Sequence, residues 1–171
     1  MPLTLADLNQ ASEPEFVRLL DGVFEHSPWV ARRGAPRRPF SNPDDLERSL
    51  CATLQQATSA EQLKLIRAHP DLAGRAARSG DLTEASTQEQ MEAGLDTLSE
   101  AEYQRFTQLN SAYQAKFDFP FILAVKGHDK HSILASFETR LENTLAAERQ
   151  TALAEICKIA GFRLKALLSS A

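Results

Sequence analysis

His69 has the side chain best suited to proton transfer near neutral pH in this sequence, and it stands directly before Pro70. An imidazole can donate or accept a proton there, because its ordinary pKa is about 6.5. The ring of a proline disfavours the helical conformation at the preceding residue, so we expect His69 at the end of a helix. His69 is therefore a candidate general acid or base. The alternative, which spacing alone favours, is a histidine that only caps a helix C-terminus.

Arg163 is a second candidate, near the end of the sequence. It falls at the edge of a stripe of apolar residues at helical spacing, formed by Leu153, Ile156, Ala160, Leu164 and Leu167. A guanidinium group that faces inward needs an ionic partner or a polar cavity. The alternative, again favoured by spacing alone, is an arginine that extends along the surface to solvent.

Ser86 and Glu89 have the spacing of a capping box, in which the two side chains satisfy each other's backbone amides at the start of a helix. The same pattern recurs at residues 12–15, 59–62 and 99–102. A helix N-terminus also attracts anions, so a capping residue can serve a ligand as well. The two interpretations of Ser86 and Glu89 do not exclude each other.

The run from Phe119 to Val125 is apolar without interruption and contains Pro120. Periodicity cannot distinguish a buried strand from a buried helix here. A lone strand would leave its backbone groups without partners, and no other segment alternates with a period of two. We therefore expect an extended entry followed by a buried turn or by a helix that begins at Phe121, whose first amides would bind a small anion. Plain hydrophobic core is the alternative.

His128 and His131 are three residues apart and could share one face of a helix. No third ligand follows at helical spacing, so we expect no metal site. The sequence also lacks the GxSxG, Walker A, GxGxxG and HExxH motifs of common hydrolases, nucleotide-binding proteins and zinc proteases. A helical metal-dependent hydrolase that uses the two histidines stays open as an alternative.

Length and composition indicate one globular domain over residues 1–171. Hydrophobic residues make up 43% of the chain and charged residues 25%, which excludes a disordered protein. The net charge of −4 argues against a nucleic-acid partner, although arginines cluster between Arg32 and Arg38. If the protein were a non-catalytic helical binding module, this cluster would contact its partner.

Cysteine usage and the lack of sorting signals predict a cytoplasmic protein. Cys51 and Cys157 lie in segments with a helical pattern and form no CxxC motif, which favours reduced thiols. The first residues do not resemble a signal peptide, and no apolar run is long enough to span a membrane. Capping signals and periodicity together predict an all-α fold, a single-domain bundle of about eight helices.

Several motifs, in the same order over nearly the whole chain, resemble the 2-oxo-4-hydroxy-4-carboxy-5-ureidoimidazoline (OHCU) decarboxylase family. They are His69-Pro70-Asp71-Leu72-Ala73-Gly74-Arg75, Leu82-Thr83 with Ser86-x-x-Glu89-Gln90, Ala93-Gly94-Leu95-Asp96, Leu109-Asn110-x-x-Tyr113-x-x-Lys116-Phe117, Phe119-Pro120-Phe121-Ile122 and Arg140-Leu141-x-Asn143. Asp118 departs from the family, which usually has glycine there. Aspartate also tolerates a left-handed turn, so we expect the same path of the chain.

The resemblance implies an all-helical enzyme that converts its small-molecule substrate OHCU to (S)-allantoin and CO₂ in urate degradation. It also implies a homodimer without cofactor or metal. By position, His69 resembles the catalytic proton donor, and Glu89 and Arg163 resemble its charged partners. The residues that resemble the substrate-binding segments are Pro70, then Ser86, Thr87, Gln88, Glu89 and Gln90, and finally Phe121, Ile122, Leu123, Ala124 and Val125.

Overall fold

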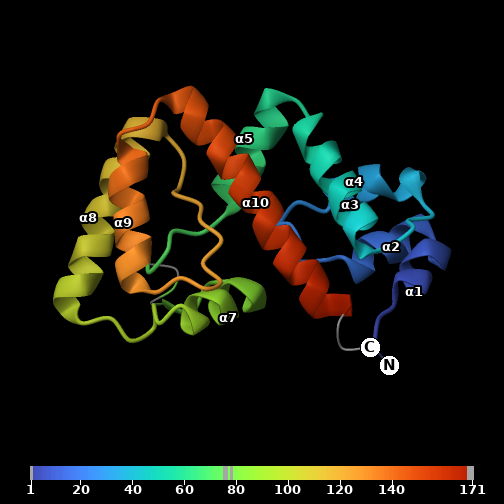
Figure 1. Ribbon diagram of the computed structural model, residues 1–171, viewed down its shortest axis with the longest axis horizontal. Coiled ribbons are helices and arrows are strands. Elements are labelled where there is room, and N and C mark those ends of the chain that lie inside the picture. The colour runs from blue at the N-terminus through green and yellow to red at the C-terminus, as the bar shows by residue number, and fades with distance from the viewer. Residues whose placement is uncertain (1, 75–76, 78, 169–171) are drawn as a thin grey trace. The chain divides into compact units, whose positions relative to one another are not determined.

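The structure is a computed structural model that describes residues 2–74, 77 and 79–168. The prediction of an all-α fold is confirmed, because the described residues form nine α-helices and one short 3-10 helix, and none of them lies in a β-strand (Figure 1). None of the helices in this part of the chain combines the length and apolar composition that a membrane span requires. Contacts between residues divide the chain into two compact units, residues 1–65 with 156–171, and residues 66–155.

The first unit contains the N-terminal helices and the last part of the final helix. Its helices are α1 (Leu5–Gln10), α2 (Glu13–Leu19), α3 (Trp29–Gly34), η1 (Ala35–Arg37), α4 (Pro43–Gln55), most of α5 (Ser59–Ala68) and the C-terminal part of α10 (Leu145–Leu168). Phe16, Leu50 and Leu54 are each at most 1% exposed, and α10 adds Ala160 and Leu164 to the same core. This apolar core anchors the C-terminal part of α10.

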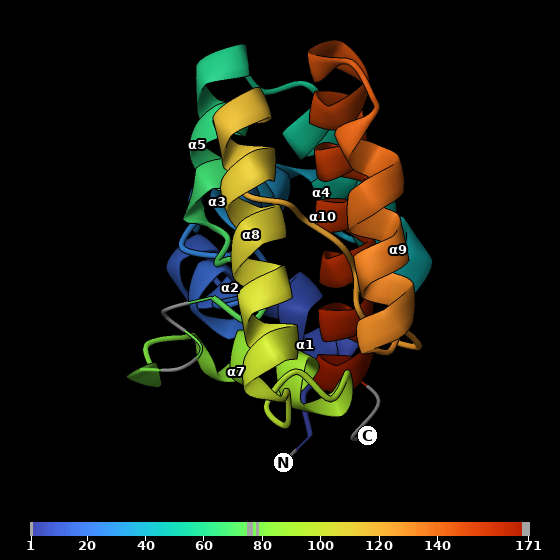
Figure 2. The same ribbon diagram turned by 90° about the vertical axis from the view of Figure 1, so that its left-hand side faces the viewer.

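The second unit contains α7 (Glu84–Glu92), α8 (Glu100–Phe117), α9 (Lys130–Leu141) and the N-terminal part of α10. Helices α8 and α9 lie side by side and run in the same direction (Figure 2). The connection between them must therefore return along their length, and residues 118–129 do so without regular secondary structure (Figure 2). Phe121 stacks on Phe137 with ring centroids 3.8 Å apart, and Tyr113 meets Phe121 edge-on. The aromatic core thus holds this connection inside the unit.

The predicted capping box is confirmed at α8 and in part at α2. Ser99 Oγ accepts a hydrogen bond from the Glu102 amide at 3.2 Å, and Glu102 Oε1 accepts one from the Ser99 amide at 2.9 Å. At α2, the Ser12 hydroxyl accepts from the Glu15 amide at 3.3 Å. Each of these serines satisfies an amide in the first helical turn, as the sequence pattern predicts.

Two capping predictions are wrong because a threonine caps the helix first. At α5 the box is formed by Thr58 and Glu61, each of which accepts a hydrogen bond from the amide of the other. At α7 the cap is Thr83, whose Oγ1 accepts from the Ser86 amide at 3.2 Å. Ser86 therefore lies inside the first turn of α7, and a role at the cap does not explain its presence.

Asp118 adopts the left-handed conformation expected at the end of α8, with φ 61° and ψ 29°. Its carboxylate lies 2.7 Å from Arg67 Nη2, and its carbonyl accepts from Arg67 Nε at 3.1 Å. The carboxylate is exposed, so the pair contributes little to stability. It does link the last turn of α5 to the start of the connection between α8 and α9.

Candidate active site

His69 lies where the sequence predicts, immediately after the last residue of α5. That helix ends at Ala68, and the His69 amide still donates to the carbonyl of Ile66 at 3.2 Å. His69 is buried, with 8% of its surface exposed. A buried imidazole between a helix end and a proline has little freedom of orientation, which suits a group that delivers a proton in one direction.

The loop that follows α5 is held in one conformation by amide side chains from two helices. Gln90 of α7 accepts from the Ala73 amide at 2.9 Å and donates to the Asp71 carbonyl at 3.3 Å. Asn110 of α8 donates to the Leu72 carbonyl at 2.9 Å. Ala73 needs such support, because its φ of 52° lies in the left-handed region that favours glycine. These bonds fix the path of the chain just after the candidate proton donor.

Asp71 and Gly74 complete this loop. Gln114 Nε2 donates to both oxygens of the Asp71 carboxylate, at 2.8 and 3.0 Å. Burial raises the pKa of the Asp71 carboxyl group, and the hydrogen bond from Gln114 opposes part of this effect. A Cβ atom at position 74 would lie 2.7 Å from the Asp71 Cβ, so the position requires glycine. Arg75, the last residue of this motif, lies outside the described residues.

The expected substrate segment 86–90 lies on α7 and presents two faces. Ser86 and Gln90 are buried, and Glu89 is half-buried. Residues three and four apart share one face of a helix, so these three side chains lie together. Thr87 and Gln88 are exposed, and their side chains form hydrogen bonds to the same helix and its cap. The structure thus groups Ser86, Glu89 and Gln90 and places Thr87 and Gln88 on the outer face.

A cavity of about 390 Å³ opens beside α7. Thr87 and Gln90 line it, together with apolar side chains such as Leu82. Its lining includes neither His69 nor residues 121–125. Ala73, in the loop that follows His69, also lines this cavity.

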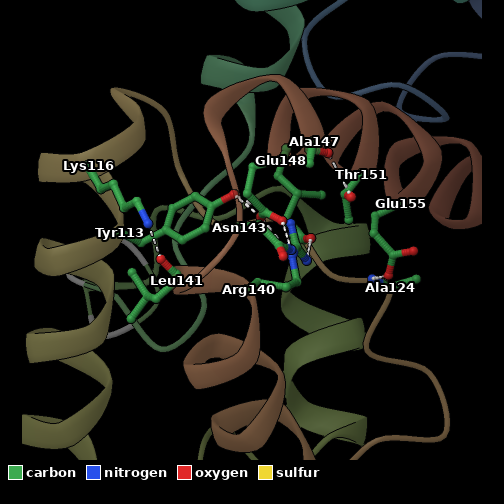
Figure 3. Close-up of polar contacts among 11 residues, drawn as sticks. Tyr113, Lys116, Ala124, Arg140, Leu141, Asn143, Ala147, Glu148, Thr151 and Glu155 are labelled. Atoms are coloured by element: carbon green, nitrogen blue, oxygen red, sulfur yellow. Dashed lines mark hydrogen bonds and ion pairs between the residues drawn. The ribbon is translucent and has the colours of Figure 1, made fainter.

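Residues 121–125 are buried, each at most 9% exposed. Of the two expected alternatives, a buried turn or a helix from Phe121, the helix does not form, and the segment has no regular secondary structure. Two side chains replace part of the hydrogen bonding that a helix would supply. Arg140 Nη1 donates to the Ile122 carbonyl at 2.5 Å. Glu155 Oε1 accepts from the Ala124 amide at 3.2 Å (Figure 3). Side chains from α9 and α10 therefore hold this irregular segment.

Other amides of this segment have no hydrogen-bond acceptor among the described residues, namely those of Phe121, Ile122, Leu123 and Val125. Buried amides without partners are rare in folded proteins. Several in one segment form a site for an anion or a carbonyl oxygen. The amides after Pro120 therefore belong to irregular chain rather than to the helix N-terminus that was one of the expectations.

A buried polar cluster that sequence analysis did not identify as functional supports this segment (Figure 3). Glu148, which is 0% exposed, accepts hydrogen bonds from Arg140 Nε at 2.8 Å, from the Tyr113 hydroxyl at 2.5 Å and from Asn143 at 2.9 Å. A buried carboxylate without such donors would be strongly unfavourable. Burial, followed by the contact with Glu148, raises the pKa of the Tyr113 hydroxyl, so that it stays protonated and can donate.

Arg140 connects this polar cluster to the aromatic core. Its guanidinium carbon lies 4.3 Å from the centroid of the Phe121 ring. Arg140 therefore contacts both the side chain of Phe121 and the carbonyl of Ile122. Arg140 and Asn143 belong to the motifs that carry the family resemblance, but no local spacing could pair them with Glu148.

Arg163 lies on α10 in the first unit and faces inward, which was one of its two predicted alternatives. Its side chain is 8% exposed. Nη1 donates to the Gly22 carbonyl at 2.8 Å, and Nη2 lies 3.0 Å from Glu25 Oε1. Glu25 is 1% exposed, and removing one partner of a buried ion pair costs about 3–5 kcal/mol. Arg163 is thus anchored within the first unit, whereas the other candidate residues belong to the second.

The two histidines considered for a metal site lie at the start of α9. His128 Nδ1 is 2.9 Å from the Ser132 hydroxyl, and His131 is exposed. Across the described ranges, no three or more side chains of His, Cys, Asp or Glu come together in a group that could hold a metal ion. Cys51 and Cys157 form no disulfide in the structure.

Comparison with known proteins identifies the family. The model of the OHCU decarboxylase family matches residues 9–165. The chain is 44% identical to the 2-oxo-4-hydroxy-4-carboxy-5-ureidoimidazoline decarboxylase of Halalkalicoccus jeotgali, over 96% of this chain and 92% of that protein. It is 40% identical to the protein of the same name from Haloferax volcanii, over 98% of each.

A solved structure supports the same assignment. The fold is similar to that of a crystal structure of (S)-allantoin synthase, with a TM-score of 0.75 and 30% identity over 97% of this chain. The chain spans about half of that protein, 54% of its length. Together with the match to the family model, these similarities show that the chain belongs to the OHCU decarboxylase family.

Proposed function

We propose that this protein removes CO₂ from OHCU and forms (S)-allantoin in urate degradation. Relatives that carry the name of this decarboxylase are 40–44% identical over nearly their full length, and a similar solved structure is named (S)-allantoin synthase. The observation that carries the proposal within the molecule is the buried His69, followed by a loop that Gln90 and Asn110 hold in place. A catalytic acid needs such a fixed position.

The chemistry of OHCU explains what the protein has to supply. The departing carboxylate is attached to a carbon that also bears a hydroxyl group, and the adjacent ring carbon is doubly bonded to nitrogen. When CO₂ leaves, the electron pair forms a carbon–carbon double bond while the C=N electrons move to nitrogen, which takes up a proton. The substrate thus provides its own electron sink, and we propose that the reaction needs neither a metal nor an organic cofactor.

Two further proton movements complete the reaction, and we assign them to His69 and Glu89. The hydroxyl group loses its proton and becomes the ring carbonyl, while the neighbouring carbon gains a proton and becomes the stereocentre of allantoin. His69 delivers the proton to that carbon from one side, which yields one optical isomer. Glu89, half-buried on α7, accepts the hydroxyl proton. General acid–base catalysis of this kind contributes typically ~10²–10⁴-fold to the rate.

Arg163 and the amides of residues 121–125 are proposed to stabilise the charge that develops on the ring. A contact that binds the carboxylate equally before and during the reaction would not accelerate it. A row of buried amides suits an anion that spreads over ring oxygen and nitrogen atoms. The Arg163 guanidinium, whose Nη1 and Nη2 already bind Gly22 and Glu25, is proposed to contribute its positive charge. Pro70 and residues 86–90 are proposed to complete the substrate contacts, and the exposed Gln88 contributes least.

We further propose that residues 1–171 act as one domain, that the protein forms a homodimer and that it works in the cytoplasm. The family resemblance supports the dimer. Light scattering of the purified protein tests it directly, and a monomeric mass with full activity would contradict it.

The reaction is tested by adding the purified protein to freshly generated OHCU and recording the circular dichroism of the allantoin formed. We expect rapid appearance of the (S) isomer. Racemic allantoin at the spontaneous rate would contradict the proposal and favour a non-catalytic binding module.

A further inference from the structure

We infer that Arg140 and Glu155 are positioning residues for the reaction, because they fix the backbone orientation of residues 121–125. The inference rests on the proposed function, since the orientation of these amides affects turnover only if the segment contacts OHCU. Neither side chain is assigned a contact with the substrate. Both act through the backbone that they hold.

The two side chains hold the segment at adjacent peptide groups. Arg140 Nη1 donates to the Ile122 carbonyl at 2.5 Å. Glu155 Oε1 accepts from the Ala124 amide at 3.2 Å (Figure 3). A trans peptide group is planar, with its carbonyl and its amide on opposite sides. The bond to the Ile122 carbonyl therefore sets the direction of the Leu123 amide, and the bond to the Ala124 amide sets the direction of the Leu123 carbonyl. Both peptide planes at Leu123 are fixed in this way.

Arg140 fixes the segment at a third point. Its guanidinium carbon lies 4.3 Å from the centroid of the Phe121 ring, on which Phe137 also stacks at 3.8 Å. The ring of Phe121 and the carbonyl of the next residue are therefore both in contact with one rigid planar group. Rotation of the chain at Phe121 or Ile122 would break at least one of these contacts.

Stability alone does not explain an arginine at this position. Buried ion pairs such as Arg140–Glu148 are often no more stabilising than apolar side chains of the same volume. A guanidinium group can, however, bind Glu148 through Nε and the Ile122 carbonyl through Nη1 at the same time. An ammonium group is a compact point charge and cannot reproduce this geometry.

The segment gains fixed donors from this arrangement. The amides of Phe121, Ile122, Leu123 and Val125 have no acceptor among the described residues. Donors that already point toward developing charge need no reorganisation during the reaction, and this is the main source of their catalytic effect. Loosening the backbone should therefore lower kcat more than it raises KM.

Paired variants at Glu155 provide the sharpest test. Glu155→Gln keeps an oxygen that can accept from the Ala124 amide, whereas Glu155→Met has similar length and no such acceptor. We expect kcat for OHCU to fall roughly 10- to 100-fold in Glu155→Met, with a smaller change in KM, and to recover most of this loss in Glu155→Gln. Equal activity of the two variants would overturn the assignment of Glu155.

Arg140→Lys tests the other contact, with Arg105→Lys as its matched control. Arg105 on α8 pairs with Glu138 at 2.8 Å on the protein surface, far more exposed than Arg140. Each variant is assayed well below its own unfolding midpoint. We expect a loss of kcat of at least tenfold in Arg140→Lys and none in Arg105→Lys. Wild-type kcat in folded Arg140→Lys would overturn its assignment.

A measurement without substrate separates this inference from the proposed function. A rigid backbone has a ¹⁵N order parameter of about 0.85. In the wild-type protein, Leu123 should have a value close to this. In Glu155→Met, its value should fall below about 0.6. If the wild-type protein does not act on OHCU, the proposed function fails while the order parameters still decide whether Glu155 fixes the backbone. An unchanged order parameter in Glu155→Met would overturn the inference by itself.

Discussion

Replacement of Gln90 by methionine tests whether this residue holds the loop that follows His69. Methionine has a similar length and a good helix propensity, so α7 should persist. The variant loses the acceptor for the Ala73 amide, which lies at 2.9 Å in a buried position, and the donor to the Asp71 carbonyl at 3.3 Å. A buried amide left without a partner costs about 1–3 kcal/mol, and the longer bond adds about 0.5 kcal/mol.

These two losses together predict that Gln90→Met lowers the free energy of unfolding by about 1.5–3.5 kcal/mol. In a protein of this size, 1 kcal/mol corresponds to about 2–4 °C in the melting temperature. We therefore expect the midpoint of thermal unfolding, followed by far-UV circular dichroism, to fall by about 3–14 °C. Gln90→Glu keeps the acceptor but not the donor, and should lie between this variant and the wild-type protein.

Gln88→Met is the matched control for stability, because Gln88 lies on the same helix and is exposed. Its side chain bonds only to Glu92 on the surface, and surface substitutions of this kind change stability by about 0.5 kcal/mol or less. Its midpoint should therefore stay within about 2 °C of the wild-type value. Equal midpoints for Gln90→Met and Gln88→Met would refute the claim that Gln90 stabilises the loop.

Two further predictions concern an arginine and a surface glutamate. Arg163→Lys keeps the charge but loses the planar pair of donors to Gly22 and Glu25. We expect this variant to remain folded and its kcat/KM for OHCU to fall at least tenfold. Near-normal turnover would contradict this expectation. A hydrogen bond from Lys130 and one from the Ser99 amide lower the pKa of Glu102 from 4.5 to about 2 in the folded protein. The stability gained from this contact is therefore complete above pH 4.5 and lost as the pH falls toward 2. In urea unfolding, Glu102→Gln should be less stable than the wild-type protein at pH 6 and about equally stable near pH 2. If the difference in the free energy of unfolding does not change with pH, the assigned cause is contradicted.

Local sequence signals predicted much of the helical framework. The Ser99–Glu102 box and the left-handed turn at Asp118 depend on residues a few positions apart, so their geometry could be inferred without the fold. The prediction that Ser86 caps α7 was wrong, because Thr83 lies three residues earlier and caps the helix there. When two capping residues are one turn apart, the spacing by itself cannot decide between them.

The long-range contacts of the candidate site could not be inferred from spacing. The segment after Pro120 was expected to form a buried turn or a helix, because a lone strand would leave its backbone groups without partners. Its actual partners, Arg140 and Glu155, lie 18 and 31 residues away in the sequence from the groups that they bind. Arg163 is similar, since Glu25 precedes it by 138 residues. The identity of these partners depends on the tertiary fold.

The optical activity of the allantoin formed from fresh OHCU tests most directly whether His69 is the proton donor. The wild-type protein and His69→Asn are assayed in parallel. His131→Asn, a change at an exposed histidine, is the control. We expect wild type and His131→Asn to produce (S)-allantoin rapidly, and folded His69→Asn to leave only the slow, racemic background. A folded His69→Asn protein that forms (S)-allantoin at the wild-type rate would contradict the account, because His69 would then not be the proton donor.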